Sequence, residues 1–226
     1  MSVKENLKLI HEQIKQAAKP WGRDFSGIKL VAVSKRQPQD KLQDALDAGH
    51  RLFGENKVQE AFEHWQDMKA DYPDLKLHLI GPLQTNKIKD ALKIFDCIET
   101  IDREKLARKL GNELKSQNRS IPCFIQVNIG EEEQKSGISP QELPEFLNFC
   151  QKDCALDIQG LMCLPPSGEP PTFYFALLQK MALEHNLSKL SMGMSRDFEK
   201  AIHLGATHIR IGTAIFGERS CGDAKN

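Results

Sequence analysis

Short apolar runs alternate with amphipathic segments along the chain, and this alternation predicts a parallel β/α fold. Residues 3–18 have apolar positions at helical spacing, which predicts an amphipathic helix that ends at Pro20 and Gly22. Eight apolar runs after this helix predict strands, and the segments that follow them have helical patterns or end in turns. The predicted strands are residues 29–35, 50–54, 76–80, 97–100, 122–129, 158–164, 189–192 and 208–211.

Eight strand-helix units in about 200 residues fit a closed (β/α)8 barrel better than an open sheet. We therefore predict an α/β protein with a single TIM-type barrel domain over residues 1–226 and an extra N-terminal helix within residues 1–20. No internal repeat, low-complexity segment or domain boundary interrupts the pattern. Residues 219–226 are polar and predict a frayed tail.

The composition narrows the function classes. The 31 basic and 31 acidic residues give a net charge of zero, which argues against a nucleic-acid or polybasic membrane surface. No apolar run approaches the ~20 residues of a membrane span, and the charged N-terminus is unlike a secretory signal. The six cysteines form no CxxC pair and the seven histidines no metal-binding spacing. This pattern is typical of a cytoplasmic protein with reduced core thiols.

Lys35 closes the first predicted strand, where a buried apolar run would not ordinarily carry a charge. In a barrel, ligands bind at the carboxyl ends of the strands. A partly desolvated lysine there has a lowered pKa and can form a Schiff base with an aldehyde. The alternative is a lysine that extends from the strand end into solvent.

Two further groups follow strands seven and eight. Gly212 and Thr213 can begin a helix whose N–H groups bind an anion, with Ser191 and Gly193 as neighbouring donors, or they only form the entry and cap of that helix. Arg210 alternates with apolar residues in the eighth strand and requires an acceptor, from an interior acid, a carbonyl or a ligand. A lysine, an anion site and a buried arginine around one mouth suggest pyridoxal 5′-phosphate (PLP).

Seven segments carry a resemblance to the YggS/PROSC family of pyridoxal phosphate homeostasis proteins, and they cover nearly the whole chain. Lys57 is a departure, because many relatives have an aromatic or another residue there. The segments are Val-Ala-Val-Ser-Lys at 31–35, Phe-Gly-Glu-Asn-Lys-Val-Gln-Glu at 53–60, His-Leu-Ile-Gly-Pro-Leu-Gln-Thr-Asn-Lys at 78–87, Lys-Ser-Gly at 135–137, Gly-Leu-Met at 160–162, Leu-Ser-Met-Gly-Met-Ser at 190–195 and Arg-Ile-Gly-Thr-Ala-Ile-Phe-Gly at 210–217.

The resemblance implies a barrel like the N-terminal domain of alanine racemase, with PLP as the cofactor and Lys35 as its Schiff-base lysine. It also implies Arg210 at the pyridine nitrogen. Asn56 either orders a loop beside the cofactor or caps the following helix, and Lys135 is interpreted as a solvated loop lysine. The remaining expected contacts, most of them near the cofactor phosphate, are Ser191, Met192, Gly193, Gly212 and Thr213.

The resemblance also implies a non-catalytic carrier or regulator in vitamin B6 homeostasis, with PLP as ligand and apo-enzymes as recipients. We expect a monomer. One alternative is a PLP enzyme such as an amino-acid racemase; another is an unrelated barrel in which Lys35 only pairs with a phosphate. We expect no efficient racemase, because the second domain that supplies the opposing tyrosine base is missing from this sequence. Neither of its two tyrosines, Tyr72 and Tyr174, follows a strand in a way that would aim it at the mouth.

Overall fold

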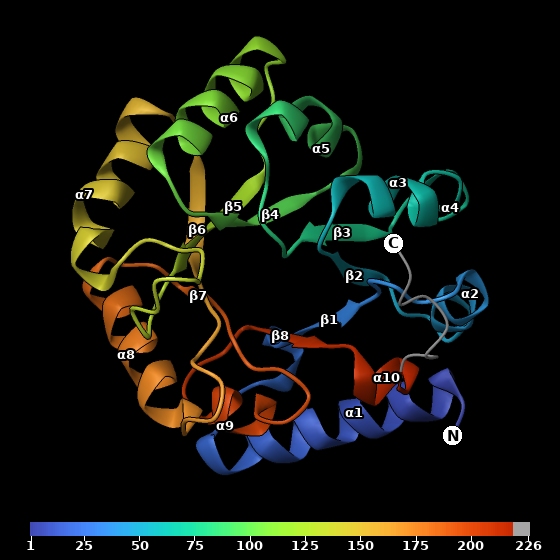
Figure 1. Ribbon diagram of the computed structural model, residues 1–226. Helices are drawn as coiled ribbons and strands as arrows, with labels where there is room; N and C mark the ends of the chain where they lie inside the picture. The colour runs from blue at the N-terminus through green and yellow to red at the C-terminus, as the bar shows by residue number, and fades with distance from the viewer. Residues whose placement is uncertain (219–226) are drawn as a thin grey trace.

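A computed structural model describes residues 1–218 of the chain, which form a closed barrel of eight parallel strands inside a ring of helices (Figure 1). The strands pair in chain order and β8 pairs with β1, so the sheet has no open edge. The predicted (β/α)8 barrel is therefore confirmed. The strands are β1 (Lys29–Val33), β2 (Leu52–Glu55), β3 (Lys76–Leu79), β4 (Cys97–Ile101), β5 (Pro122–Val127), β6 (Asp157–Cys163), β7 (Lys189–Ser191) and β8 (His208–Ile211).

The helices lie outside the barrel and cover the outer faces of the strands (Figure 1). Short 3-10 turns occur at Lys19–Trp21, Phe25–Gly27, Thr85–Lys87 and Pro140–Glu142. The α-helices are α1 (Val3–Ala18), α2 (Gln39–Asp47), α3 (Val58–Trp65), α4 (Met68–Asp71), α5 (Ile88–Ile94), α6 (Glu104–Ser116), α7 (Leu143–Asn148), α8 (Pro171–Glu184), α9 (Phe198–His203) and α10 (Thr213–Phe216).

Helix α1 has the bounds that its apolar spacing predicts. Ser2 and Glu5 form a capping box that satisfies its first N–H groups. The buried face of α1 includes Leu7 and Ile10, and the helix packs against α2, α9 and α10 (Figure 1). The Asn6 amide also donates to the Ile215 carbonyl at 2.8 Å. The N-terminal helix therefore holds the last elements of the barrel in place.

Some element bounds differ from the sequence prediction for local reasons. β1 ends at Val33 rather than Lys35, because the chain turns over Ser34–Gln37. The helical segment after β2 is divided into α3 and α4, and the segment that begins with α7 ends in a π-helical turn at Phe149–Asp153. α9 begins after Asp197, whose carboxylate accepts from the Met194 N–H rather than capping the helix. The predicted frayed tail, and Cys221 with it, lie outside the described residues.

The main apolar core lies between the strands and the helices, and several polar and charged side chains are buried among the strands. A separate apolar cluster of Cys97, Phe124 and Met162 lies apart from the main core. Glu99 and Arg210 are buried among the strands, 0% and 4% exposed. The five cysteines among residues 1–218 are buried and form no disulfide, as the interpretation of core thiols requires.

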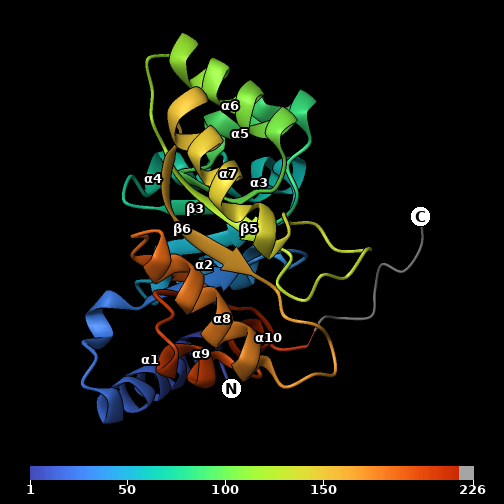
Figure 2. The same cartoon turned by 90° about the vertical axis from the view of Figure 1, so that its left-hand side faces the viewer.

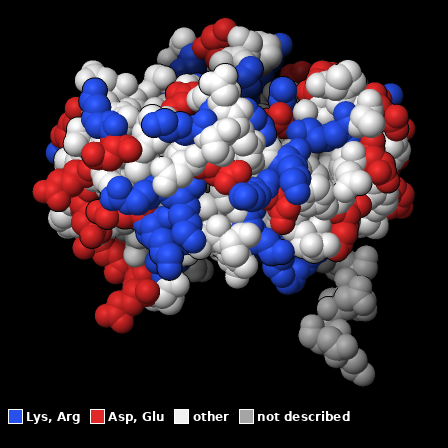
Figure 3. All heavy atoms as spheres, turned by 90° about the horizontal axis from the view of Figure 1, so that it is seen from above, with Lys and Arg blue, Asp and Glu red and all other residues white. Residues whose placement is uncertain are grey.

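The strands point toward one mouth of the barrel, from which the long loops after β5 and β6 project (Figure 2). Positive and negative side chains are interspersed on the face that α5 and α6 cover (Figure 3). Among residues 1–218, no helix combines the length and the apolarity that crossing a membrane requires.

Candidate functional site

Lys35 lies two residues beyond β1 on a tight turn at the carboxyl mouth, and its side chain is partly buried. The Gln37 N–H donates to the Ser34 carbonyl at 3.0 Å, and Arg36 within the turn has a positive φ of 56°. The Arg36 N–H also donates to the Glu60 carboxylate. These contacts fix the backbone on both sides of the lysine.

The buried carboxylate of Glu55, at the end of β2, anchors the same turn. Its Oε1 accepts from the Ser34 hydroxyl at 2.6 Å and from the Trp65 indole at 3.1 Å. His64 lies 2.9 Å from that oxygen. Burial alone would lower the pKa of His64, but the hydrogen bond and charge of Glu55 outweigh it and raise the pKa. Glu55 therefore positions the segment that carries Lys35.

A cavity of about 540 Å³ opens at this mouth. Four of the predicted site residues line it: Lys35, Arg210, Gly212 and Thr213. The other walls come from residues 165–169 with Pro171, after β6, and from residues 194–197 with Lys200, after β7. The sequence analysis did not place those two segments in the site. Their position directly after barrel strands was the signal that could have assigned them to the site.

The cavity has several groups that suit an anion. α10 begins at Thr213, whose exposed side chain lies at the cavity, and the N–H groups of a first helical turn have no intrahelical acceptors. Arg196 and Lys200 add two exposed cations. Gly212 is tightly placed, because a Cβ atom there would lie 3.3 Å from the Val33 carbonyl oxygen. β1 and the entry of α10 therefore meet at the cavity wall.

Ser191, Met192 and Gly193 lie behind this wall rather than on it, and all three are buried. The Ser191 hydroxyl donates to Glu99 Oε2 at 2.5 Å and accepts from Arg210 at 2.6 Å. Gly193 has a φ of +91°, and a Cβ atom there would lie 2.6 Å from the Ala201 Cβ. The predicted phosphate contacts of Ser191 and Gly193 remain predictions, and in this structure both residues support the wall.

Asn56 is separated from the main cavity. It lines a neighbouring cavity of about 240 Å³ together with Lys135 and Gly81. A Cβ atom on Gly81 would lie 2.3 Å from the Asn56 carbonyl oxygen, so only glycine permits this close approach of two strand ends. Lys135 donates to the Pro165 carbonyl at 3.0 Å and pairs with Glu132. Asn56 as a cofactor contact also remains a prediction.

Arg210 connects the cavity to the barrel interior. Its guanidinium donates to the Ser191 hydroxyl and, at 2.8 Å, to the Cys163 carbonyl, so one of the predicted acceptor types, a carbonyl, is a direct partner. Beyond Ser191, the Glu99 carboxylate lies 2.6 Å from Nδ1 of His78. Burial raises the pKa of Glu99, but the hydrogen bond and charge of His78 and the charges of His208 and Arg210 outweigh it and bring the pKa to about 2. Sequence reasoning missed Glu99.

Comparison with known proteins agrees with this architecture. The family described as the alanine racemase N-terminal domain matches residues 6–220. A solved alanine racemase from Clostridium difficile superposes with a TM-score of 0.72 at 14% identity, and the match covers 97% of this chain and 58% of that one. At that identity the likeness concerns the fold. Fold and site together define a barrel of the alanine racemase N-terminal type, with a lysine and an arginine at its carboxyl mouth.

More similar full-length relatives identify the family. A Vibrio cholerae protein named pyridoxal phosphate homeostasis protein is 40% identical, over 96% of this chain and 97% of its own. Its Escherichia coli K12 counterpart is 37% identical over 96% and 97%. PipY of Synechococcus elongatus, solved with PLP bound, superposes with a TM-score of 0.76 at 33% identity, over 91% of this chain and all of PipY. The chain belongs to the family of pyridoxal phosphate homeostasis proteins.

Proposed function

We propose that this protein binds PLP in the mouth cavity and acts as a non-catalytic carrier or regulator in the homeostasis of that cofactor. The observation that carries the proposal is the convergence of Lys35, Arg210, Gly212 and Thr213 on one cavity. The names of the relatives and the PLP bound to PipY support it. In this proposal the chain is one cofactor-binding domain that works as a cytoplasmic monomer.

The residues present fit this cofactor. A cavity of about 540 Å³ is of the size that small-molecule ligands occupy. The Lys35 amine can condense with the PLP aldehyde to a Schiff base, with loss of water. Arg196, Lys200 and the Thr213 hydroxyl offer charge and hydrogen bonds to a phosphate. Arg210 lies at the same cavity, where a permanently protonated guanidinium can face a ring nitrogen that stays unprotonated.

A racemase is less well supported than a carrier. Bound PLP supplies an electron sink for amino-acid chemistry, but racemisation also needs proton donors on both faces of the substrate carbon. Tyr72 bonds to Gln43 and lies over Arg51, away from the cavity-lining residues. Tyr174 donates its hydroxyl proton to Glu169 on the cavity rim, and this hydrogen bond raises the pKa of the phenol. A tyrosine held protonated in this way is a poor base.

The proposal is tested by the absorption spectrum of the protein incubated with PLP, followed by borohydride reduction and peptide mass mapping. A visible band that borohydride abolishes, with the label on Lys35, is the expected result. Lys29→Ala is the matched control, because Lys29 begins the same strand at the opposite end and is exposed. A label mainly on Lys135 would refute the role of Lys35. Transfer of the bound cofactor to an apo-enzyme then tests the carrier role.

A further inference from the structure

A further cavity, the lower cavity, opens at the opposite, amino-terminal mouth of the barrel. The cavity beside Lys35 at the carboxyl mouth is called the upper cavity. The lower cavity has a volume of about 380 Å³, and its lining includes the first residues of β3, β4, β5, β7 and β8. Three cationic side chains, Lys76, Arg119 and Lys189, surround it, against one carboxylate, Asp96. Asp96 is already shared, because it pairs with Lys69 at 2.8 Å and with Lys76 at 3.5 Å. With the buried Glu99 behind His78 also counted, three cations face two carboxylates, so the cavity keeps an excess of positive charge in a chain whose net charge is zero.

The other two cations have only neutral partners. Arg119 donates to the Leu92 carbonyl at 2.8 Å, and Lys189 donates to the Gln159 side chain. No carboxylate within 4 Å of either is found among residues 1–218. An electropositive cavity whose cations have only neutral acceptors as partners is suited to an anionic ligand.

Two histidines close the inner end of this cavity. His78 and His208 are 9% and 8% exposed, with ring centroids 5.7 Å apart. Burial lowers the pKa of His208 to about 4, and the charge of Lys189 also lowers it, so this imidazole is neutral at pH 7. A neutral imidazole can donate one N–H to an anion without the cost of burying a further charge. His208 can therefore add a directional donor beside the cations, whereas the N–H of His78 is already donated to Glu99.

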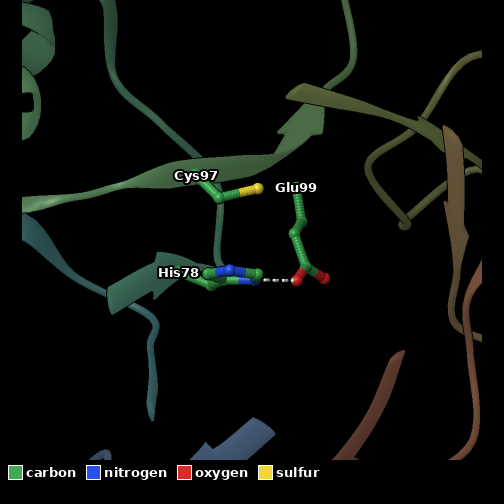
Figure 4. Close-up of side chains that lie close together, drawn as sticks. All are labelled: His78, Cys97 and Glu99. Carbon is green, nitrogen blue, oxygen red and sulfur yellow. Dashed lines mark hydrogen bonds and ion pairs between the residues drawn. The ribbon is translucent and has the colours of Figure 1, made fainter. Parts of the chain in front are cut away.

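His78, Cys97 and Glu99 also resemble a metal site, since their ligand atoms lie within 4.8 Å of one another (Figure 4). Their surroundings favour another interpretation. Both Glu99 oxygens already accept hydrogen bonds, from His78 and from Ser191. Burial and the nearby Glu99 raise the pKa of Cys97 well above its ordinary value, so the thiol is protonated. The cations of the cavity would also repel a divalent ion.

One series of hydrogen bonds joins this cavity to the carboxyl mouth. His78, on the wall of the lower cavity, bonds to Glu99 at 2.6 Å. Ser191 donates to the other Glu99 oxygen at 2.5 Å and accepts from Arg210 at 2.6 Å. Arg210 lines the upper cavity beside Lys35. An event that reorients His78 therefore changes the acceptor environment of Arg210 through two intervening side chains.

We propose that the amino-terminal mouth binds a small anion, a phosphate or carboxylate, between Arg119, Lys189 and the two histidines. Occupancy is transmitted through Glu99 and Ser191 to Arg210, so the anion regulates how the upper cavity holds its cofactor. This second statement rests on the function proposed above, whereas the anion site does not.

The anion site is tested by NMR of the histidine imidazole protons in PLP-loaded protein, so that the upper phosphate site is already occupied. Inorganic phosphate is added, with potassium chloride at equal ionic strength as the reference. We expect saturable shifts of the His78 and His208 signals, assigned with His208→Asn, in phosphate only. Arg119→Gln with Lys189→Gln should weaken phosphate binding about tenfold or more.

The matched control is Lys93→Gln with Lys180→Gln, which removes the same charge from exposed helix positions and should leave the shifts unchanged. Lys189→Arg keeps the charge and should keep binding even if the double variant is poorly folded. Equal phosphate affinity in the double variant and the wild type, or the absence of saturable shifts in wild type, would overturn the site. Stoichiometric Zn²⁺ binding that Cys97→Ser abolishes would replace it with a metal site.

The transmission is read from the absorption band of the bound cofactor during the same titration. Phosphate should shift the band in wild type, and Ser191→Ala should remove that shift while the histidine signals still respond. A band that responds equally in both proteins overturns the transmission. Failure of PLP to bind refutes the proposed function. The anion site is then still tested, because the histidine signals can be followed in the protein without cofactor.

Discussion

The Arg210 guanidinium donates to the Ser191 hydroxyl at 2.6 Å, and neither side chain is more than 4% exposed. Both residues were predicted as separate cofactor contacts, yet each is a partner of the other. The Glu99 carboxylate, bonded to Ser191 at 2.5 Å, supplies the negative charge of the group. The position of Arg210 at the cavity therefore depends on a residue that does not line the cavity.

Removing the Glu99 carboxylate should destabilise the fold strongly. Glu99→Ala leaves Arg210 buried without its counter-charge and Ser191 without its acceptor. Breaking a buried ionic group in this way costs about 3–5 kcal/mol of unfolding free energy. Urea denaturation followed by circular dichroism measures the loss. Glu184→Ala, at an exposed ion pair with Lys180, should cost less than about 1 kcal/mol. Equal losses in both variants would contradict the role of Glu99.

The phosphate of the cofactor should dominate its affinity. Arg196, Lys200 and Thr213 offer charge-assisted and hydroxyl hydrogen bonds to a dianion at the cavity. Pyridoxal keeps the aldehyde that reacts with Lys35 but lacks these contacts. We expect it to bind at least about a hundredfold more weakly than PLP, as measured by fluorescence titration. Lys200→Gln should narrow the difference between the two ligands. Equal affinities would place the phosphate elsewhere.

The protein should not racemise amino acids at an ordinary enzyme rate. Its tyrosines at Tyr72 and Tyr174 are engaged with Gln43 and Glu169, so a second base opposite Lys35 is not provided by them. Deuterium exchange at the α-carbon of L-alanine, with chiral analysis of the product, measures this. Turnover on the order of 1 per second or faster would establish an enzyme. Slow exchange that Tyr174→Phe leaves unchanged agrees with a carrier.

Acidification should destabilise the protein through His208. Burial lowers the pKa of this imidazole to about 4, whereas an unfolded chain titrates near about 6.5. Between these values the unfolded chain binds more protons, so the stabilisation present above pH 6.5 is lost as the pH falls toward 4. The difference corresponds to roughly 3 kcal/mol. His208→Asn should flatten the dependence of unfolding free energy on pH in this window, measured in chloride buffers. An unchanged slope would show that other groups cause it.

Gly81 should not tolerate even the methyl side chain of alanine. A Cβ atom there would lie 2.3 Å from the Asn56 carbonyl oxygen, and backbone atoms cannot move aside cheaply. Gly81→Ala should therefore lower stability by about 1–3 kcal/mol. Gly27→Ala is the matched control, because nothing lies within 4 Å of its Cβ position. Thermal unfolding compares the two, and a stable Gly81→Ala variant would mean that the strand ends separate easily.

Strong periodicity made most of the fold predictable. α1 and β8 have their predicted bounds, because an apolar helical stripe and an apolar alternating run each have only one face that can be buried favourably. The convergence of Lys35, Arg210 and Thr213 followed from the rule that parallel strands end at one mouth. Glu99 could not be assigned in the same way. Its short strand is otherwise mostly apolar, and the partners of Glu99 come from β3 and β7, distant in sequence.

Other differences arise where tertiary contacts decide local structure. Asn56 follows a strand end, but the close approach of Gly81 places it beside a different, smaller cavity. Ser191 also follows the expected pattern, although its hydroxyl is held inside the barrel by Glu99 and Arg210. Strand spacing predicts which mouth a residue is near, whereas the side-chain partners determine which wall it occupies.

The closure of the ring between β1 and β8 also determines when the site can form during synthesis. Lys35 emerges from the ribosome early, whereas Arg210 and Thr213 come some 175 residues later, at the rate of synthesis of ~5–20 residues per second. Until β8 is made, β1 lacks one of its two neighbours and α1 lacks α9 and α10. Such long-range pairing is slow to form and leaves a strand edge open in the meantime. The nascent chain therefore cannot capture the cofactor between these residues before its last strand has docked.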